Sequence, residues 1–434
     1  MFNNVEFIEK KRDGGIHTRQ EINSMVSGII NGTVRDYQVS AWLMASFLKG
    51  LNDDETMFLT EALANSGEKL SYSESLHVMD KHSTGGVGDK TTIIFVPLAA
   101  ACGVKISKLS GPGLGYTGGT VDKLESIPGM KLHLTESEFK EQVEKIGCAV
   151  SGHSLKLAPA EGMLYKLRDV TGTVPSVALI TSSIISKKLA GGASAYVFDV
   201  KSGSGAFMKN REEACSLAEN LVAISSKLGK KSAVLITDME QPLGKYIGNA
   251  AEVYEAIEVL SGRGPDDTRK LSILLGASVL VMSDIASNFE EGKTLCAAAL
   301  DSGSALNKFK ELIEAQHGDS SILQTPEVLI SKTKYIFEIK SPRTGFVSKL
   351  DALCIGEALR ALGGGRLRMQ DEIDPYVSIE LCAKIGDKID KDGTIIKVHY
   401  DDERQIQNAA PYLKECFEIS DKAEKRKLVI DHIL

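Results

Sequence analysis

Two stretches of this sequence combine lysine and hydroxyl side chains with glycine-rich loops. Residues 76–92 read LHVMDKHSTGGVGDKTT, and residues 104–127 read VKISKLSGPGLGYTGGTVDKLESI. In both, a β-prone run enters a glycine loop that leads into a helical pattern. Such a loop presents backbone N–H groups and a helix N-terminus to an anion. Two of them in one α/β unit predict a site that grips one phosphate group from several sides.

The side chains that could complete this site are cations and hydroxyl donors. A phosphate dianion needs a fixed positive charge and several hydrogen-bond donors in place of its water shell. The candidates are Lys81, Ser83, Thr92, Lys108, Ser110 and Thr120. Phosphate bound in this way can itself be the nucleophile, so that neither a Ser-His-Asp triad nor a glycosidase carboxylate pair is required.

These and other motifs resemble those of the pyrimidine-nucleoside phosphorylase and thymidine phosphorylase family. The resemblance rests on KHSTGGVGDK and SGPGLGYTGGTVDKLESIPG, and it extends over nearly the whole chain through KKRDGG, RDYQVSAWLMA, LRDVTGTV, DVKSGSGAFM and GEALRALGGGRLR. It implies an enzyme of nucleoside salvage or catabolism, in which inorganic phosphate attacks C1′ of a pyrimidine nucleoside. The products would be the free base and (deoxy)ribose 1-phosphate. The choice among uridine, thymidine and deoxyuridine stays open.

The resemblance assigns roles to single residues. The six candidates above match the phosphate-binding positions of the family. The base-binding positions correspond to Tyr165, Arg168, Ser183 and Lys187. Arg168 and Lys187 would donate to the pyrimidine carbonyls, and Ser183 to the ring edge. The catalytic residues would be Lys81, His82, Arg168 and Lys187, with His82 donating to the base carbonyl or acting as a general acid.

A monovalent cation site is also implied, in which backbone carbonyls supply most of the ligands of a structural K⁺. The matching positions are Gly88, Lys90, Leu243, Tyr246 and Glu255. Lys90 and Tyr246 depart from the residue types expected there, and the ammonium of Lys90 could replace the ion. We expect no organic cofactor and no divalent metal, with inorganic phosphate as the co-substrate.

Two alternatives from other functional classes stay open. Pro112 and Tyr116 stand where the family pattern has arginine and histidine, which leaves room for a catalytically silent nucleoside- or phosphate-binding protein. An enzyme like anthranilate phosphoribosyltransferase would need an acidic magnesium site for pyrophosphate. Asp122 and Glu125, one helical turn apart, are the pair that such a site could use.

Two nucleotide-binding motifs are matched only in part. Residues 113–118 satisfy G-x-G-x-x-G, but three residues separate the first glycine from the preceding strand, and no acidic residue is found to end a second strand at the required distance. Residues 85–91 resemble a Walker loop, but Asp89 stands where a glycine must precede the lysine. We therefore favour inorganic phosphate over a nucleotide as the anion.

Composition narrows the class of partner. The chain has 434 residues, a net charge of −7 and a pI near 5.8, which argues against a nucleic-acid binder that relies on a basic face. No window is apolar over the length of a membrane span, and the first residues lack an apolar signal core. Seven dispersed cysteines are typical of reduced thiols. We expect a cytoplasmic enzyme without nucleic-acid or membrane partners, and the family implies a homodimer.

Helical and α/β patterns alternate along the chain, which predicts an α/β fold with two discontinuous domains. Residues 1–65 and 160–193 would form an all-helical domain for base recognition and dimer contact. Residues 75–155 and 195–335 would form a larger α/β domain, with a mainly parallel central sheet, that binds phosphate. Residues 341–434 would form a small β-rich C-terminal subdomain. The active site is expected in the cleft between the first two domains, which must close for catalysis.

Overall fold

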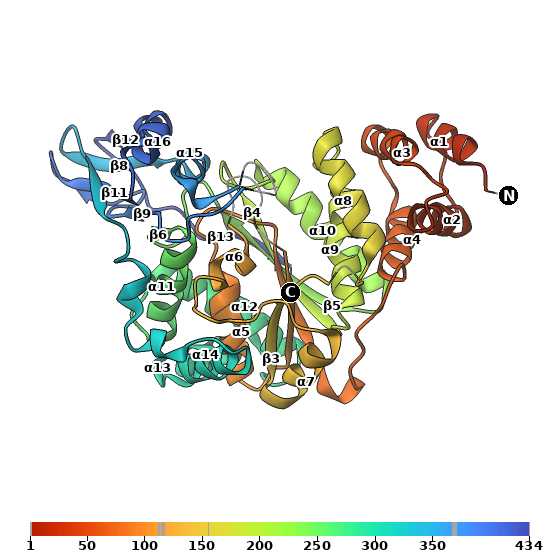
Figure 1. The fold of residues 1–434 in the computed structure, drawn as a ribbon, viewed down its shortest axis with the longest axis horizontal. Helices are drawn as coiled ribbons and strands as arrows, with labels where there is room; N and C mark the ends of the chain where they lie inside the picture. Colours follow the sequence, from red (N-terminus) through yellow and green to blue (C-terminus); the bar gives the residue numbers. More distant parts are fainter. Residues whose placement is uncertain (1, 112, 114–117, 155, 367–370, 434) are drawn as a thin grey trace.

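The computed structural model describes residues 2–111, 113, 118–154, 156–366 and 371–433. Pro112 and Tyr116 lie outside these residues. An N-terminal helical bundle and a C-terminal β-rich region lie at opposite ends of the molecule, with an α/β domain between them (Figure 1). None of the helices in the described ranges is long and apolar enough to cross a membrane.

The helical bundle joins the start of the chain to a later segment. Its helices are α1 (Asn4–Arg12), α2 (Arg19–Ile30), α3 (Asp36–Lys49), α4 (Asp53–Ala64), α8 (Pro159–Thr171) and α9 (Val177–Ala190). The fully buried Trp42 packs in their core, where Leu164 of α8 and Leu179 of α9 join residues of α2 and α4. Further along α9, Ile184 and Ile185 pack into the core of the α/β domain. The helix α9 therefore belongs to both cores.

The central sheet has the order β13-β5-β4-β1-β2-β3, and all neighbours are parallel except β13 and β5. The strands are β1 (Met79–Ser83), β2 (Ile106–Ser110), β3 (Cys148–Gly152), β4 (Ala195–Ser202), β5 (Lys231–Asp238) and β13 (Val429–Ile433). All eight residues of β4 are buried. Such continuous burial is typical of a parallel strand that helices cover on both faces.

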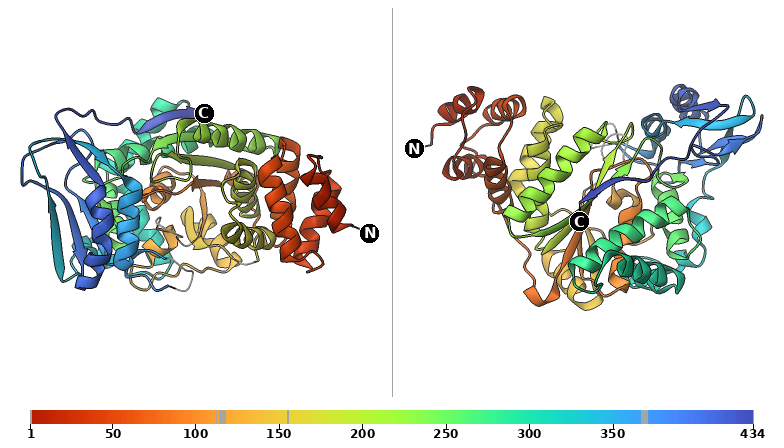
Figure 2. Two further views of the ribbon diagram at one scale, coloured as in Figure 1. Left: turned by 90° about the horizontal axis from the view of Figure 1, so that it is seen from above. Right: turned by 180° about the vertical axis from the view of Figure 1, so that it is seen from behind.

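Helices cover both faces of this sheet (Figure 2). They are α5 (Thr91–Ala101), α6 (Thr120–Leu124), α7 (Glu136–Ile146), α10 (Arg211–Lys227), α11 (Asn249–Leu260), α12 (Asp266–Met282), α13 (Phe289–Asp301) and α14 (Ser304–Ala315). A capping box of Thr135 and Glu138 starts α7. The apolar helix α5 begins at Thr91, directly after the first glycine loop.

The glycine loops start later than the sequence pattern suggested. Lys81, His82 and Ser83 lie within β1 and pair in register with residues 197–199 of β4. In the sequence these polar residues read as loop, because a buried strand is usually apolar. Their side chains therefore sit on the rigid carboxyl end of a central strand, which is where parallel sheets bind ligands.

In its described residues, the C-terminal region combines two small sheets with the helices α15 (Ala352–Leu359) and α16 (Glu403–Glu415) and a short helical turn at Arg360–Gly364. Its strands are β7 (Tyr335–Lys340), β8 (Gly345–Leu350), β9 (Ser378–Leu381), β10 (Lys388–Ile389), β11 (Thr394–Tyr400) and β12 (Phe417–Ser420). The short strand β6 (Tyr246–Ile247), from the α/β domain, extends one of these sheets by pairing with β9. Conversely, β13 leaves the region and covers the edge of β5. The predicted subdomain at 341–434 therefore includes one strand that hydrogen-bonds to the main sheet.

Candidate active site

Lys81 is the centre of the predicted phosphate site. Its side chain is fully buried, and its ammonium donates to the hydroxyls of Thr91 at 2.7 Å and Thr92 at 3.1 Å, in the first turn of α5. Burial lowers the pKa of Lys81, although the carboxylates of Asp89 and Asp199 oppose this shift. A buried cation that hydrogen-bonds to neutral hydroxyls at a helix N-terminus is a strong site for an anion.

The carboxylate of Asp89 accepts from two hydroxyls of this loop, one of which, that of Thr91, also accepts from Lys81. It accepts from the hydroxyl of Ser83, and from the hydroxyl of Thr91 at 2.5 Å. Burial would raise the pKa of Asp89, but Lys201, Lys81 and Lys123 together hold it well below its ordinary value. Asp89 is therefore ionised and fixes the loop between β1 and α5. From the sequence it was noted only as a mismatch with a Walker motif.

Lys108 lies on β2, directly beside β1. Its ammonium donates to the carbonyl of Leu109 at 3.0 Å and lies 4.0 Å from Asp80. Lys188 of α9, which the sequence analysis missed, pairs with the other oxygen of Asp80 at 2.6 Å. Burial and the neighbouring Lys188 hold the pKa of Lys108 well below its ordinary value. Two lysines thus share one carboxylate next to the end of β1.

The other two predicted phosphate ligands lie on the second loop. Ser110 ends β2, and Thr120 begins α6. Asp122 ties this loop together by accepting from the backbone N–H of Gly119 at 3.2 Å, and it also pairs with Arg366. The carboxylate that the magnesium alternative would need is therefore already engaged. In the described ranges, no group of three His, Cys, Asp or Glu residues is placed to hold a metal ion.

Three of the four predicted base-binding residues meet on adjacent helices. The ammonium of Lys187 lies 3.2 Å from the hydroxyl of Ser183 on the next turn of α9, and 5.4 Å from the ring centre of Tyr165 on α8. Glu161 joins them: it accepts from Ser183 and pairs with Lys187 at 3.0 Å. Glu161 was missed because its place in a helical first turn has an ordinary explanation.

The guanidinium of Arg168 is hydrogen-bonded to backbone carbonyls and not to these side chains. It donates to the carbonyls of Thr173 at 3.4 Å, Val174 at 2.7 Å and Leu179 at 3.0 Å, so it holds the turn between α8 and α9. Three of its five N–H groups are used in this way. In this structure Arg168 supports the helix pair, and its predicted contact with a base would have to use the remaining N–H groups.

His82 lies near four lysines of the site. Burial holds its pKa well below the ordinary value, and Lys188, Lys108, Lys187 and Lys81 add to the shift. The imidazole is therefore neutral at neutral pH when no anion is bound. The predicted general-acid role needs a protonated ring, whereas donation to a base carbonyl needs only the neutral one.

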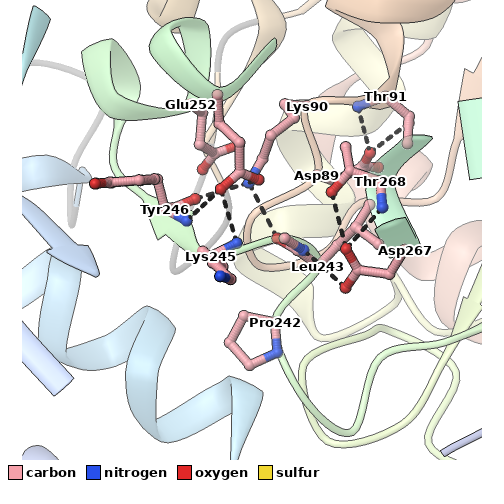
Figure 3. A network of polar contacts seen from close by, with 12 residues as sticks. Asp89, Lys90, Thr91, Pro242, Leu243, Lys245, Tyr246, Glu252, Asp267 and Thr268 are labelled. Atoms are coloured by element: carbon pink, nitrogen blue, oxygen red, sulfur yellow. Dashed lines mark hydrogen bonds and ion pairs between the residues drawn. The ribbon is translucent and has the colours of Figure 1, made fainter. Parts of the chain in front are cut away.

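The five positions predicted to hold a monovalent cation meet around a lysine. The ammonium of Lys90 donates to the carbonyls of Leu243 at 3.0 Å and Tyr246 at 2.7 Å (Figure 3). It also donates to Glu255 at 2.7 Å. These oxygens therefore already have a cation, and the residues do not fit K⁺ at this point. Lys90 donates to these protein oxygens, whereas the lysine of a Walker motif reaches the bound phosphates. The loop therefore differs from a Walker loop.

Comparison with known proteins places this geometry in a family. A model of the glycosyl transferase family a/b domain matches residues 75–306, and its helical bundle domain matches residues 5–67. A model of the pyrimidine nucleoside phosphorylase C-terminal domain matches residues 346–420. The chain is 45% identical to a pyrimidine-nucleoside phosphorylase of Staphylococcus haemolyticus and 44% identical to one of Staphylococcus aureus strain USA300, over 98% of each chain. It belongs to the pyrimidine-nucleoside phosphorylase family.

Among solved structures, the fold is similar to that of anthranilate phosphoribosyltransferase from Thermus thermophilus. The TM-score is 0.59 at 18% identity, and the match covers 71% of this chain and 99% of the other. This likeness concerns the fold, which phosphorylases and phosphoribosyltransferases can share without sharing a reaction. The resemblance stated from the sequence is confirmed, as are the fold class and the assignment as an enzyme of this family.

The charge around His82 gives a first prediction. A phosphate dianion bound beside Lys81 would offset the field of the lysines, so it should raise the pKa of His82 by about one pH unit or more. Titration of the histidine ring signals by NMR, with and without phosphate, measures this shift. The exposed His432 serves as the control and should not move. A pKa of His82 that stays unchanged at saturating phosphate would place the anion elsewhere.

The two adjacent lysines of α9 give a second prediction. Lys187 lies with Ser183 and Glu161, whereas Lys188 lies with Asp80. We expect Lys187→Met to lower kcat/KM for the nucleoside by about 10²-fold while equilibrium phosphate binding changes little. Lys166→Met, on the exposed face of α8, is the matched control. An equal loss of phosphate affinity in Lys187→Met would contradict the separation of the two subsites.

Proposed function

We propose that this chain catalyses the phosphorolysis of pyrimidine nucleosides to the free base and (deoxy)ribose 1-phosphate. The observation that carries this proposal is the buried ammonium of Lys81, which hydrogen-bonds to neutral hydroxyls of a helix N-terminus. A phosphate dianion would supply an anion in direct contact with Lys81, whose present partners are neutral hydroxyls. Relatives 44–45% identical over almost the full length bear the name of the same activity.

The proposed reaction divides between two subsites. Phosphate bound by Lys81, Ser83 and Thr92 would attack C1′ of the sugar, whose glycosidic bond breaks as the sugar becomes oxocarbenium-like. The pyrimidine leaves with negative charge, which hydrogen-bond donors stabilise. Lys187 would donate to it, Ser183 would do so once its hydroxyl leaves Glu161, and neutral His82 would donate to a carbonyl of the base.

The two proposed subsites lie on different elements of the fold. Lys81 is on the central sheet, whereas Lys187 is on α9, which packs both on the sheet and on the helical domain. A small rotation of the helical domain would move the base relative to the phosphate. We propose that closure brings the phosphate oxygen in line with C1′, because misalignment of reacting atoms by about 1 Å can cost 10²-fold in rate.

Two further features remain proposals. A homodimer would use the helical domain, on which Tyr37 and Leu48 of α3 are 74% and 71% exposed. Light scattering coupled to size-exclusion chromatography measures the mass directly. The cytoplasm is the proposed location, supported by the dispersed, unpaired cysteines, because such thiols persist in a reducing compartment.

A panel of uridine, thymidine and deoxyuridine with inorganic phosphate tests the activity. We expect free base and sugar 1-phosphate in equal amounts, formed only when phosphate is present and equally well with EDTA. Loss of turnover with EDTA that magnesium restores, or turnover only with phosphoribosyl pyrophosphate, would overturn the proposal. Binding of nucleoside without any turnover would favour the silent binder.

Lys81 itself gives a sharper test. Lys81→Met keeps the length of the side chain and removes its charge, so kcat/KM for phosphate should fall by about 10²-fold or more, the scale for losing one preorganised electrostatic group. Lys105→Met is the control, because Lys105 donates only to the carbonyl of Glu144 in the described structure. Near-normal kinetics in Lys81→Met would show that the nucleophile binds elsewhere.

A further inference from the structure

Lys90 is buried at a junction of three segments. It precedes the first turn of α5, and its ammonium reaches residues 243–246 and Glu255 of α11 (Figure 3). The side chain of Lys90 is fully buried and that of Glu255 is 2% exposed. A buried ion pair is stable only when its other donors and acceptors are also satisfied.

All hydrogen-bonding groups of this pair find partners. An ammonium has three N–H donors, and Lys90 has three oxygen acceptors, at 3.0, 2.7 and 2.7 Å. The second oxygen of Glu255 accepts from the backbone N–H groups of Lys245 and Tyr246, each at 2.8 Å. Two carbonyls and one carboxylate around a single positive charge form the ligand set of a hard monovalent cation.

The backbone is shaped around this ammonium. Gly244 has φ of +72°, and a Cβ there would lie 1.8 Å from Glu255 Oε1 and 2.7 Å from Lys90 Nζ. Gly88 has φ of +74°, and its Cβ would lie 2.4 Å from the carbonyl oxygen of Leu243. No side chain fits at either position, because the glycine loop and the 243–246 segment approach too closely.

Residues 242–246 also contact a second lysine, Lys384. Lys384 of the C-terminal region donates to the carbonyls of Pro242 at 2.6 Å and Gly244 at 3.1 Å, and pairs with Asp267 at 2.6 Å. The backbone carbonyls of residues 242–246 therefore accept hydrogen bonds from two different ammonium groups. Lys90 connects this segment to α5, and Lys384 connects it to the C-terminal region.

We propose that Lys90 is a built-in cation that takes the place of a bound monovalent ion, so that this chain needs no K⁺. The Lys90 ammonium fixes the N-terminus of α5, where Thr91 and Thr92 hold Lys81. It therefore acts as a positioning residue for the phosphate subsite. The activity readout of this proposal rests on the proposed function, whereas its stability readout does not.

The same geometry predicts how an ion requirement could be created. Lys90→Thr removes the ammonium and opens a space lined by the carbonyls of Leu243 and Tyr246 and by Glu255. K⁺ or NH₄⁺ should enter that space. Lys90→Met removes the charge but fills the space, so it should not respond to either ion. Lys245→Thr, an exposed lysine of the same segment, is the matched control.

The test compares each protein in K⁺, in NH₄⁺ and in tetramethylammonium, an ion too large for the space, at constant ionic strength. Thermal unfolding midpoints and the KM for phosphate are measured. The wild type and Lys245→Thr should be the same in all three salts. In tetramethylammonium, Lys90→Thr should unfold about 5 °C lower, and its KM for phosphate should be about tenfold higher. K⁺ and NH₄⁺ should restore both values in Lys90→Thr and neither in Lys90→Met.

The wild-type protein decides the proposal even if the variants fold poorly. A wild type whose unfolding midpoint or phosphate KM improves with K⁺ over tetramethylammonium would overturn it. So would a folded Lys90→Thr whose midpoint and KM are the same in all three salts. If no activity is found on any nucleoside, the proposed function fails, and the unfolding midpoints still test the built-in cation.

Discussion

The structure depends on an excess of positive charge buried at the carboxyl ends of β1 and β2. Lys81 donates to hydroxyls, Lys108 shares Asp80 with Lys188, and burial lowers the pKa of both Lys81 and Lys108. Burying a cation without a full partner costs free energy unless an anion offsets it. The lysines stay buried because rigid strands and the N-terminus of α5 hold them in place. A bound phosphate would offset the buried positive charge, and the free energy gained in this way would add to its affinity.

The surrounding structure keeps this charge in a fixed arrangement. Asp89 anchors the loop between β1 and α5, and Asp122 ties the second loop to Arg366 of the C-terminal region. Lys90 connects α5 to the segment before α11. The C-terminal region therefore contacts the site through Arg366. It supports the loops that define the phosphate subsite, which explains why residues far apart in the sequence converge there.

Much of this could be predicted from the sequence, because it rests on local patterns. The helical segments and the parallel sheet follow from the alternation of helical and α/β patterns, and the phosphate candidates follow from residue types next to glycine loops. The strand at Lys81–Ser83 was harder to predict, because the residues of a central strand are usually apolar. The pairing of β13 with β5 joins segments far apart in the sequence, and no local pattern carries such a contact.

The residues that were missed share one property: their importance comes from a partner distant in the chain. Glu161 pairs with Lys187, and Lys188 with Asp80. The positions of the two subsites are tested most directly by a crystal structure of the protein with phosphate and a pyrimidine base bound together. We expect phosphate oxygens within hydrogen-bond distance of Lys81, Ser83 and Thr92, and the base against Ser183 and Lys187. Phosphate bound on α9 instead, with Lys81 still held only by Thr91 and Thr92, would contradict the account.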